Sequence, residues 1–147
     1  MKYFLLFFFL PSLLYAQNIK IIDGDTIHIA KIKYRFHGID APEISQMCRV
    51  NNTNIKCGIL SKKKLVKKIG KKKVNCQKKA VDRYKRVVAE CFVNDESLSK
   101  YLVKNGYAFA YRKYSKKFVE DENYAKENRL GLWSMDFQYP WDYRRNK

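Results

Sequence analysis

Polar and hydrophobic residues alternate along the first part of the chain with the two-residue period of half-buried strands. Residues 19–22 and 26–29 are rich in β-branched side chains, and the acidic, glycine-containing segment between them predicts a tight turn. Residues 32–37 repeat the alternation, and Gly38 and Pro42 then end it. The pattern therefore predicts three strands joined by short turns.

The middle of the chain predicts a loop, a helix and a hairpin. Residues 48–56 are polar and rich in asparagine, which favours an irregular loop. Within residues 58–69 the apolar positions recur near helical spacing, and Gly70 provides a stop. Residues 74–76 and 86–93 have the composition of the two arms of a hairpin.

Two more helices are predicted in the last third. Residues 96–105 gather apolar side chains on one helical face. Asn94 or Asp95 is the expected N-cap, and Gly106 occupies the C-cap position. A third helix is expected over residues 116–129.

The other segments of the last third are rich in aromatic residues. Residues 107–114 are expected to be extended, and Ser115 can cap the helix that follows. Residues 133–147 have no clear period, and we expect them to pack through their aromatic side chains. The chain of 147 residues is long enough for one domain, and residues 17–147 are predicted to form it.

The first 16 residues, MKYFLLFFFLPSLLYA, contain one basic residue, an apolar run and a small residue at the end. This pattern is typical of a secretory signal peptide, and the run is shorter than the about 20 residues of a membrane-spanning helix. We expect cleavage after Ala16 and export to a periplasm or to the outside of the cell. Retention of residues 1–16 as an anchor is the alternative.

The charge is strongly asymmetric. The chain has 31 Lys and Arg against 14 Asp and Glu, a formal net charge of +17. Ten lysines lie within residues 62–79, and no acidic residue occurs between Glu43 and Asp82. A charge run is usually a solvated face, but a net charge this large favours a polyanionic partner: nucleic acid first, an anionic envelope surface second.

Four cysteines in a short exported chain indicate two disulfides. They are Cys48, Cys57, Cys76 and Cys91, and four cysteines allow three pairings. We favour Cys48 with Cys57, which closes a short loop. Cys76 with Cys91 would then face each other across the predicted hairpin.

Residues 34–43, YRFHGIDAPE, place a cation and two carboxylates at the end of a predicted strand. Arg35 carries a planar fork of donors that suits a phosphate. Asp40 and Glu43 supply hard oxygen atoms that can hold a metal ion or act as a base. This combination suits a phosphodiester substrate.

A second acidic cluster precedes it in IIDGDTIHIA, residues 21–30, where Asp23 and Asp25 flank a glycine that could simply form a turn. DRYKR at residues 82–86 and GLW at residues 131–133 follow later. In this order and spacing, DGDT, then R with xxxxDAPE, then DRYxR closely resemble the thermonuclease family, the staphylococcal-nuclease-like secreted endonucleases.

The resemblance runs from about residue 19 to residue 133. It implies an α+β fold that is mainly β: a five-stranded OB-type Greek-key barrel with about three packed helices. The order of the predicted elements is compatible with this fold and supports it only weakly without the resemblance.

In that family the matching carboxylates lie at a calcium ion. The resemblance implies Asp25 and Asp40 as direct ligands, the backbone carbonyl of Ala41 as a third ligand, and Asp23 acting on the site through water. The family often has Thr at the place of Ala41, but a main-chain oxygen survives that change.

The resemblance assigns catalysis to Arg35, Glu43 and Arg86. Glu43 would orient and activate the attacking water, and the two arginines would offset the charge that grows on the scissile phosphate. Without the resemblance, Glu43 would be interpreted as a surface carboxylate and both arginines as solvated strand charges.

Substrate contacts are expected from aromatic and basic residues. Tyr84 matches a family tyrosine that contacts the nucleotide, and Tyr111 or Tyr114 is expected to do the same, with packing at the rim as the alternative. The outer face of the basic helix should raise the capture of nucleic acid; its residues are Lys62, Lys63, Lys67 and Lys68.

The leading hypothesis is a secreted, calcium-dependent endonuclease that hydrolyses DNA and RNA with little sequence specificity and leaves 3′-phosphate ends. The alternative is a catalytically inactive module on the same fold that binds nucleic acid or the envelope. Loss of Glu43 or of either arginine would have favoured the alternative. We expect a monomer without a stable protein partner.

Overall fold

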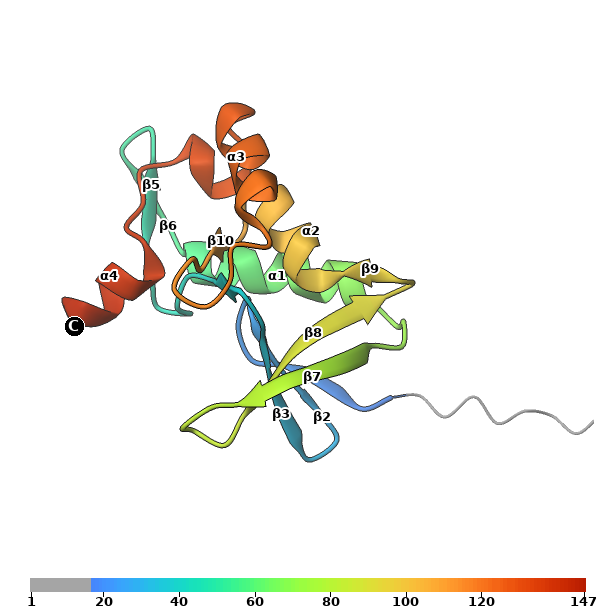
Figure 1. Ribbon diagram of the computed structural model, residues 1–147. Coiled ribbons are helices and arrows are strands. Elements are labelled where there is room, and N and C mark those ends of the chain that lie inside the picture. The colour runs from blue at the N-terminus through green and yellow to red at the C-terminus, as the bar shows by residue number, and fades with distance from the viewer. Residues whose placement is uncertain (1–16) are drawn as a thin grey trace, which may run out of the picture.

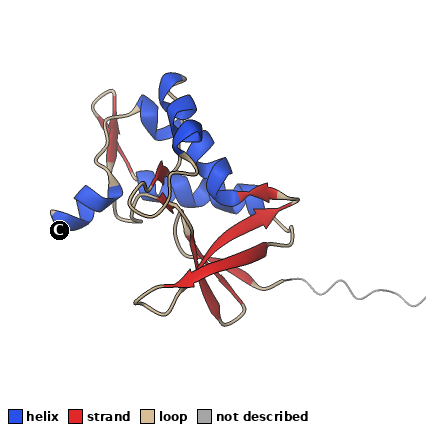
Figure 2. Cartoon of the chain, viewed as in Figure 1, coloured by secondary structure: helices blue, strands red, loops and turns tan. Residues whose placement is uncertain are grey.

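A computed structural model describes residues 17–147, so the expected signal peptide, residues 1–16, lies outside the described residues. Figures 1 and 2 show a twisted β-sheet at one end of the molecule with a group of helices packed above it. Between residues 17 and 147, every helix is too short or too polar to cross a membrane.

The main sheet follows an order that requires a crossover. Its hydrogen-bonded path is β1 (Ile19–Ile21), β2 (Thr26–Ile29), β3 (Ile32–Phe36), β8 (Val87–Val93) and β7 (Asn75–Val81). All neighbours are antiparallel except β3 and β8, which run parallel, and the short β9 (Glu96–Ser97) adds to β8. A parallel pair needs a long connection, and α1 (Cys57–Ile69) lies within it. This architecture confirms the α+β, OB-type fold class.

The two ends of this path are joined by a side chain. Gln17 precedes β1, and its Nε2 donates to the carbonyl oxygen of Val74 (3.0 Å) while its Oε1 accepts from the backbone N–H of Val74 (2.8 Å). Because Val74 precedes β7, these two hydrogen bonds hold the first and last strands of the path together.

The core lies between the sheet and two helices. The α1 helix and α2 (Leu98–Lys104) lie over the sheet in Figure 1, and α3 (Val119–Glu127) packs against α2. Apolar residues from all these layers are buried together, among them Ile27, Phe36, Leu65, Ile69, Ala89, Leu98 and Leu102. Burying such side chains contributes most of the favourable free energy of folding.

A second, smaller core holds the C-terminal segment. Phe109 and Leu132 are fully buried in it beside the Cys48–Cys57 disulfide. The last 13 residues add an aromatic layer to this cluster through Phe137, Tyr139 and Trp141, and they end in the helix α4 (Pro140–Arg145). The expected aromatic packing of the tail is confirmed, but its sequence did not predict a helix.

The prediction of an irregular loop over residues 48–56 is wrong. Strands β5 (Cys48–Val50) and β6 (Thr53–Ile55) form a hairpin there. Asn51 and Asn52 occupy its turn with φ of 47° and 62°. Asparagine tolerates this left-handed conformation better than most residues, and two such residues make the turn that suits a two-residue hairpin.

The start of the second predicted helix is also different. Residues 96 and 97 extend the sheet as β9, and α2 begins at Leu98 with Ser97 as its N-cap, which accepts from the backbone N–H of Lys100 (3.3 Å). Asn94 and Asp95, the expected caps, instead form the left-handed turn before β9, with φ of 49° and 60°.

The aromatic segment 107–114 is less extended than predicted. Only β10 (Phe109–Ala110) is a strand, and it pairs with β4 (Ile39–Asp40). The third helix is shorter than residues 116–129, with α3 beginning at Val119, and the short η1 (Gly131–Ser134) follows it. Pairing with β4 fixes the start of the aromatic segment beside Asp40.

The structure pairs the cysteines as the sequence predicted. Cys48 joins Cys57, and Cys76 joins Cys91. Cys76 and Cys91 are direct partners in the register of β7 and β8, although β7 runs from Asn75 to Val81 and is longer than the predicted arm. The second disulfide therefore links two neighbouring strands near the start of β7.

Replacing Cys76 and Cys91 together by Ala should lower the free energy of unfolding by about 3 kcal/mol, because the bond closes a loop of 15 residues in the unfolded chain. Urea titration followed by far-UV circular dichroism measures this change. An unfolding midpoint equal to that of the unmodified protein would contradict a stabilising role.

Candidate active site

Two buried carboxylates share one arginine at the end of the β2–β3 hairpin. Asp25 precedes β2, Arg35 lies on β3 opposite Thr26, and Asp40 lies on β4. The Arg35 Nη1 donates to Oδ1 of Asp25, and its Nη2 donates to Oδ1 of Asp40 at 2.6 Å. The Asp25 and Asp40 side chains are 1% and 0% exposed. The structure therefore brings together three of the predicted site residues.

The burial of Asp25 has an electrostatic consequence. Removal from water raises the pKa of the Asp25 carboxyl well above its ordinary value, and the negative charges of Asp23 and Asp40 add to this effect while Arg35 opposes it. Although burial lowers the pKa of Arg35, Asp25 and Asp40 more than offset this and raise it. Burial and the neighbouring carboxylates thus outweigh the effect of Arg35 on the charged form of Asp25.

The main chain around this pair fixes its geometry. The backbone N–H of Ala41 donates to Oδ2 of Asp25 at 2.6 Å, and Asp23 accepts the backbone N–H of Asp25 at 3.0 Å within the turn before β2. Asp23 is thus a turn residue beside the pair, at a place compatible with its expected indirect role.

The donors at this point suit a hard cation. Between residues 17 and 147, the structure contains no group of three or more His, Cys, Asp or Glu side chains placed to hold a metal ion. The expected set has only two carboxylates, Asp25 and Asp40, with the carbonyl of Ala41 as the third protein donor. All three are oxygen donors, which is the ligand type that calcium takes in proteins.

The loop that carries Glu43 is held tightly against α1. A Cβ atom on Gly58 would lie 1.7 Å from the carbonyl oxygen of Glu43, so only glycine fits at this approach. A Cβ atom on Gly24 would lie 2.7 Å from the Cβ of Ala41. These two close approaches place the loop between the acidic turn and the first residues of α1, and Glu43 remains 38% exposed.

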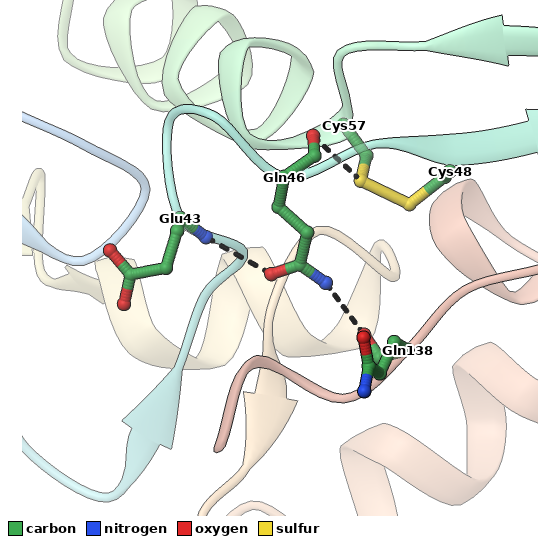
Figure 3. Close-up of a disulfide and its surroundings, with 5 residues drawn as sticks. All are labelled: Glu43, Gln46, Cys48, Cys57 and Gln138. Atoms are coloured by element: carbon green, nitrogen blue, oxygen red, sulfur yellow. Dashed lines mark hydrogen bonds between the residues drawn. A yellow bond between two sulfur atoms is a disulfide. The ribbon is translucent and has the colours of Figure 1, made fainter. Parts of the chain in front are cut away.

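Gln46 anchors the same loop from inside. Its side chain is completely buried, and its Oε1 accepts the backbone N–H of Glu43 at 3.2 Å while its Nε2 donates to the carbonyl oxygen of Gln138 at 2.6 Å (Figure 3). Cys57 Sγ lies 3.4 Å from the carbonyl oxygen of Gln46; a disulfide sulfur carries no proton, so this is a packing contact. The carboxylate of Glu43 points away from this network.

An arginine of the C-terminal helix completes the cluster. Arg144 donates from Nη2 to Oδ2 of Asp40 (2.6 Å), and from Nη1 to Oδ1 of Asp40 (3.1 Å) and to Oε1 of Glu43 (2.8 Å). Partial burial lowers the pKa of Arg144, but these hydrogen bonds outweigh that effect and raise the pKa above its ordinary value. Arg144 was not predicted from the sequence, in which a basic pair near the end of an aromatic tail is the only signal.

Arg86 lies just before β8 and is oriented by its own turn. Its Nε donates to Oδ2 of Asp82 at 2.7 Å, and Oδ1 of Asp82 accepts the backbone N–H groups of Tyr84 and Arg86, each at 2.9 Å. Burial raises the pKa of the Asp82 carboxyl, but these hydrogen bonds outweigh that effect and lower the pKa below its ordinary value. Between residues 17 and 147, the side-chain hydrogen bonds of Arg86 go to Asp82, so the structure does not join Arg86 to Glu43.

The sequence model of a family described as Staphylococcal nuclease homologue matches residues 33–135, which include Arg35, Asp40, Glu43 and Arg86. The chain belongs to this family. The resemblance to thermonucleases is thereby confirmed. The roles of the individual residues in the site stay predictions.

Individual relatives agree with this assignment. A micrococcal nuclease of Shigella flexneri is 31% identical over an alignment that covers 88% of this chain and 80% of that protein. An uncharacterized endonuclease of Haemophilus influenzae is 33% identical over 81% of this chain and 66% of its own length. A probable staphylococcal-like nuclease of Oryza sativa subsp. japonica is 32% identical over 90% of this chain. The chain spans about a quarter to just over a third of such plant relatives.

The tyrosines expected to bind substrate in this family member differ in accessibility. Tyr84 and Tyr114 are 62% and 65% exposed. Tyr111 is half-buried, with one ring face stacked on Trp141 (centroids 5.5 Å apart, planes 3° apart) and the edge of Tyr114 nearby. Tyr84 and Tyr114 therefore have exposed rings, with the guanidinium groups of Arg83 and Arg86 at 4.9 and 5.3 Å from the ring centroid of Tyr84, and Tyr111 packs at the rim.

The basic helix of this nuclease homologue presents only some of its lysines to solvent. Lys63 and Lys67 are exposed and Lys62 is half-buried. Lys68 forms an ion pair with Glu96 and lies 4.5 Å from the ring centroid of Tyr101. The ammonium group of Lys68 therefore already has partners within the protein.

Replacing Gln46 by Met should lower the free energy of unfolding by roughly 2 to 4 kcal/mol, because each main-chain group left without a partner costs about 1 to 3 kcal/mol. Urea titration measures this change, with Gln77→Met as the control because Gln77 is exposed on β7. Equal unfolding midpoints for the two variants would show that Gln46 does not anchor the loop.

Proposed function

We propose that this chain is an endonuclease that hydrolyses phosphodiester bonds in DNA and RNA. The observation that carries the proposal is the position of Asp40: it is fully buried, bonded to Arg35 and Arg144 at 2.6 Å each, and three residues before a half-exposed Glu43. Membership of a family of nuclease homologues supports the same conclusion. Paired carboxylates and arginines at one strand end suit the charge of a phosphodiester.

Glu43 is the proposed base. Its carboxylate is accessible, whereas those of Asp25 and Asp40 are buried. It accepts a proton from the attacking water as the water oxygen forms a bond to phosphorus. The bond from phosphorus to the 5′ oxygen breaks, and that oxygen takes up a proton. The products are a 3′-phosphate and a 5′-hydroxyl.

Arg35 and Arg86 are the proposed donors to the phosphate oxygens, where their charge offsets the negative charge of the transition state. A calcium ion bound by Asp25, Asp40 and the carbonyl of Ala41 would add positive charge at the phosphate and acidify a bound water. Asp23 would support that site through water, as part of the turn that shapes Asp25.

Substrate selection follows from charge and from exposed rings. The net charge of +17 attracts any polynucleotide, and contacts from Lys62, Lys63 and Lys67 to the phosphate backbone carry no sequence information. Tyr84 and Tyr114 have exposed rings, and aromatic rings of this kind stack on unpaired bases. DNA and RNA are therefore both proposed substrates, with little sequence preference.

Export is part of the proposal. Residues 1–16 have the pattern of a signal peptide, and the two disulfides suit an oxidising compartment outside the cytosol. A catalytically inactive module that binds nucleic acid or the envelope is the second candidate, because the positive charge alone would support binding.

Protein comprising residues 17–147 should cleave both plasmid DNA and RNA in the presence of calcium and should stop when a chelator is added. Gel electrophoresis of the products measures cleavage, and end-labelling identifies the phosphate at the 3′ end. Conversion of supercoiled plasmid to linear fragments distinguishes internal cleavage from digestion at ends. Binding without cleavage under all metal conditions would favour the inactive module.

Glu43→Gln and Arg86→Lys should each lower the rate of cleavage by about 10² to 10³, because one loses the base and the other the forked donor to the transition state. Rates are measured at saturating substrate, and circular dichroism checks folding. Glu127→Gln and Arg129→Lys are matched controls, because both residues are exposed at the end of α3. Parent rates for both site variants would place the chemistry elsewhere.

A further inference from the structure

The tail after residue 135 lies outside the part of the chain that matches the family model, yet it contacts the candidate active site. Its path is fixed by Gln138, whose carbonyl oxygen accepts from Gln46, and by a stack of three rings. Tyr139 and Trp141 have centroids 4.6 Å apart and planes 9° apart, and Tyr111 covers the other face of Trp141. This docking brings Arg144 to Asp40.

Arg144 occupies the oxygen atoms that a metal ion would need. Oδ2 of Asp40 accepts from Arg144, and Oδ1 accepts from both Arg35 and Arg144. A carboxylate has about four lone-pair sites, so three of those on Asp40 are already used. A cation that approached this carboxylate would also meet the positive charge of Arg144 at hydrogen-bond range, where like charges repel.

We propose that Arg144 is an internal counter-ion that competes with a divalent cation for Asp40, so that metal binding and the docked position of α4 exclude each other. The inference rests on the calcium site of the proposed function. Its chemistry is an exchange of one cation for another on the same carboxylate, and the displaced guanidinium also releases Glu43, its other partner.

The helix is built to release this contact without unfolding the domain. Arg144 is 38% exposed, so its guanidinium already borders the solvent and does not have to cross the core to leave Asp40. It lies near the end of a six-residue helix that is also held by the buried Pro140, the ring stack and a 3.1 Å hydrogen bond between Tyr143 and Ser45. The fully buried Phe109 and Leu132 beneath belong to other elements, so the centre of the smaller core stays in place when the end of α4 that carries Arg144 moves.

Coupling between two sites is reciprocal. If Arg144 weakens the binding of calcium to Asp40, then calcium weakens the attachment of α4 by the same factor. The first effect is measured as a change in calcium affinity. The second is measured as a change in the protection of main-chain amides in the tail, so two independent measurements report the same competition.

Isothermal titration of calcium into residues 17–147 tests the first effect. Arg144→Gln should tighten calcium binding by about five- to 150-fold, the usual range of coupling between sites. Arg145→Gln is the matched control, because it removes the same charge from the next residue of α4, which pairs with Asp142 instead. Its calcium affinity should change much less than that of Arg144→Gln.

Trp141→Ala gives a second variant that changes no charge. Removing the middle ring of the stack should loosen α4 and also tighten calcium binding, which keeps the test valid if Arg144→Gln folds poorly. Hydrogen exchange of residues 136–147, followed by mass spectrometry, should become faster in the unmodified protein when calcium is added. In Arg144→Gln it should be fast with and without calcium.

Equal calcium affinities for the unmodified protein, Arg144→Gln and Arg145→Gln would overturn the proposal. Weaker calcium binding in Arg144→Gln than in the unmodified protein would also overturn it, as would slower hydrogen exchange of residues 136–147 when calcium is added. The same holds if none of the three proteins binds calcium. The outcome is separable from that of the proposed function: a shift in calcium affinity without cleavage of DNA or RNA would support the competition and reject the nuclease.

Discussion

A carboxylate can stay charged inside a protein only where positive groups or hydrogen-bond donors replace the water it has lost. Arg35, which bonds to both Asp25 and Asp40, and Arg144, which bonds to Asp40, are the positive groups at this site. Removing water from such ions costs several kcal/mol each, so the surrounding elements must hold the partners accurately. The charged partners are held by three elements: the β2–β3 hairpin, the short β4 strand and the C-terminal helix.

The loop between Asp40 and Cys48 holds the backbone of Glu43 in a defined position next to the buried carboxylates. Gly24 and Gly58 let the loop approach its neighbours closely, Gln46 holds its main chain from inside, and the Cys48–Cys57 disulfide fixes its far end to α1. Each support uses a group that has little freedom in the folded state. Glu43 itself remains accessible because these restraints act on the backbone around it.

The sequence predicted the parts of the site that are close together along the chain. Arg35 and Asp40 lie five residues apart, and the alternation of β3 places them at one strand end, while Asp25 follows from the short turn of the preceding hairpin. Arg144 could not be found in this way, because 104 residues separate it from Asp40 and its segment has no period. Gln46 was missed because a single polar residue in a loop gives no signal that it is buried.

The prediction of the fold failed where local sequence permits two outcomes. Asn51 and Asn52 suit both an open loop and a tight hairpin turn, and the pairing of β5 with β6 decides between them. Residues 96 and 97 suit a helix start, but they pair with β8 and delay α2 by two positions. The disulfides were predicted because their spacing agreed with a loop closure and with a hairpin register that the structure contains.

Because β7 is the last strand of the path, its lysines also affect whether another strand can pair with the sheet. A strand with one unpaired side offers N–H and C=O groups to which a second molecule could add, and such edges are a common origin of aggregation. Lys78 and Lys79 lie exposed on this edge, and the register of β7 is interrupted between Lys78 and Ala80. Charge and an irregular ladder both oppose such pairing, so Lys78 and Lys79 disfavour the addition of a second chain at this edge.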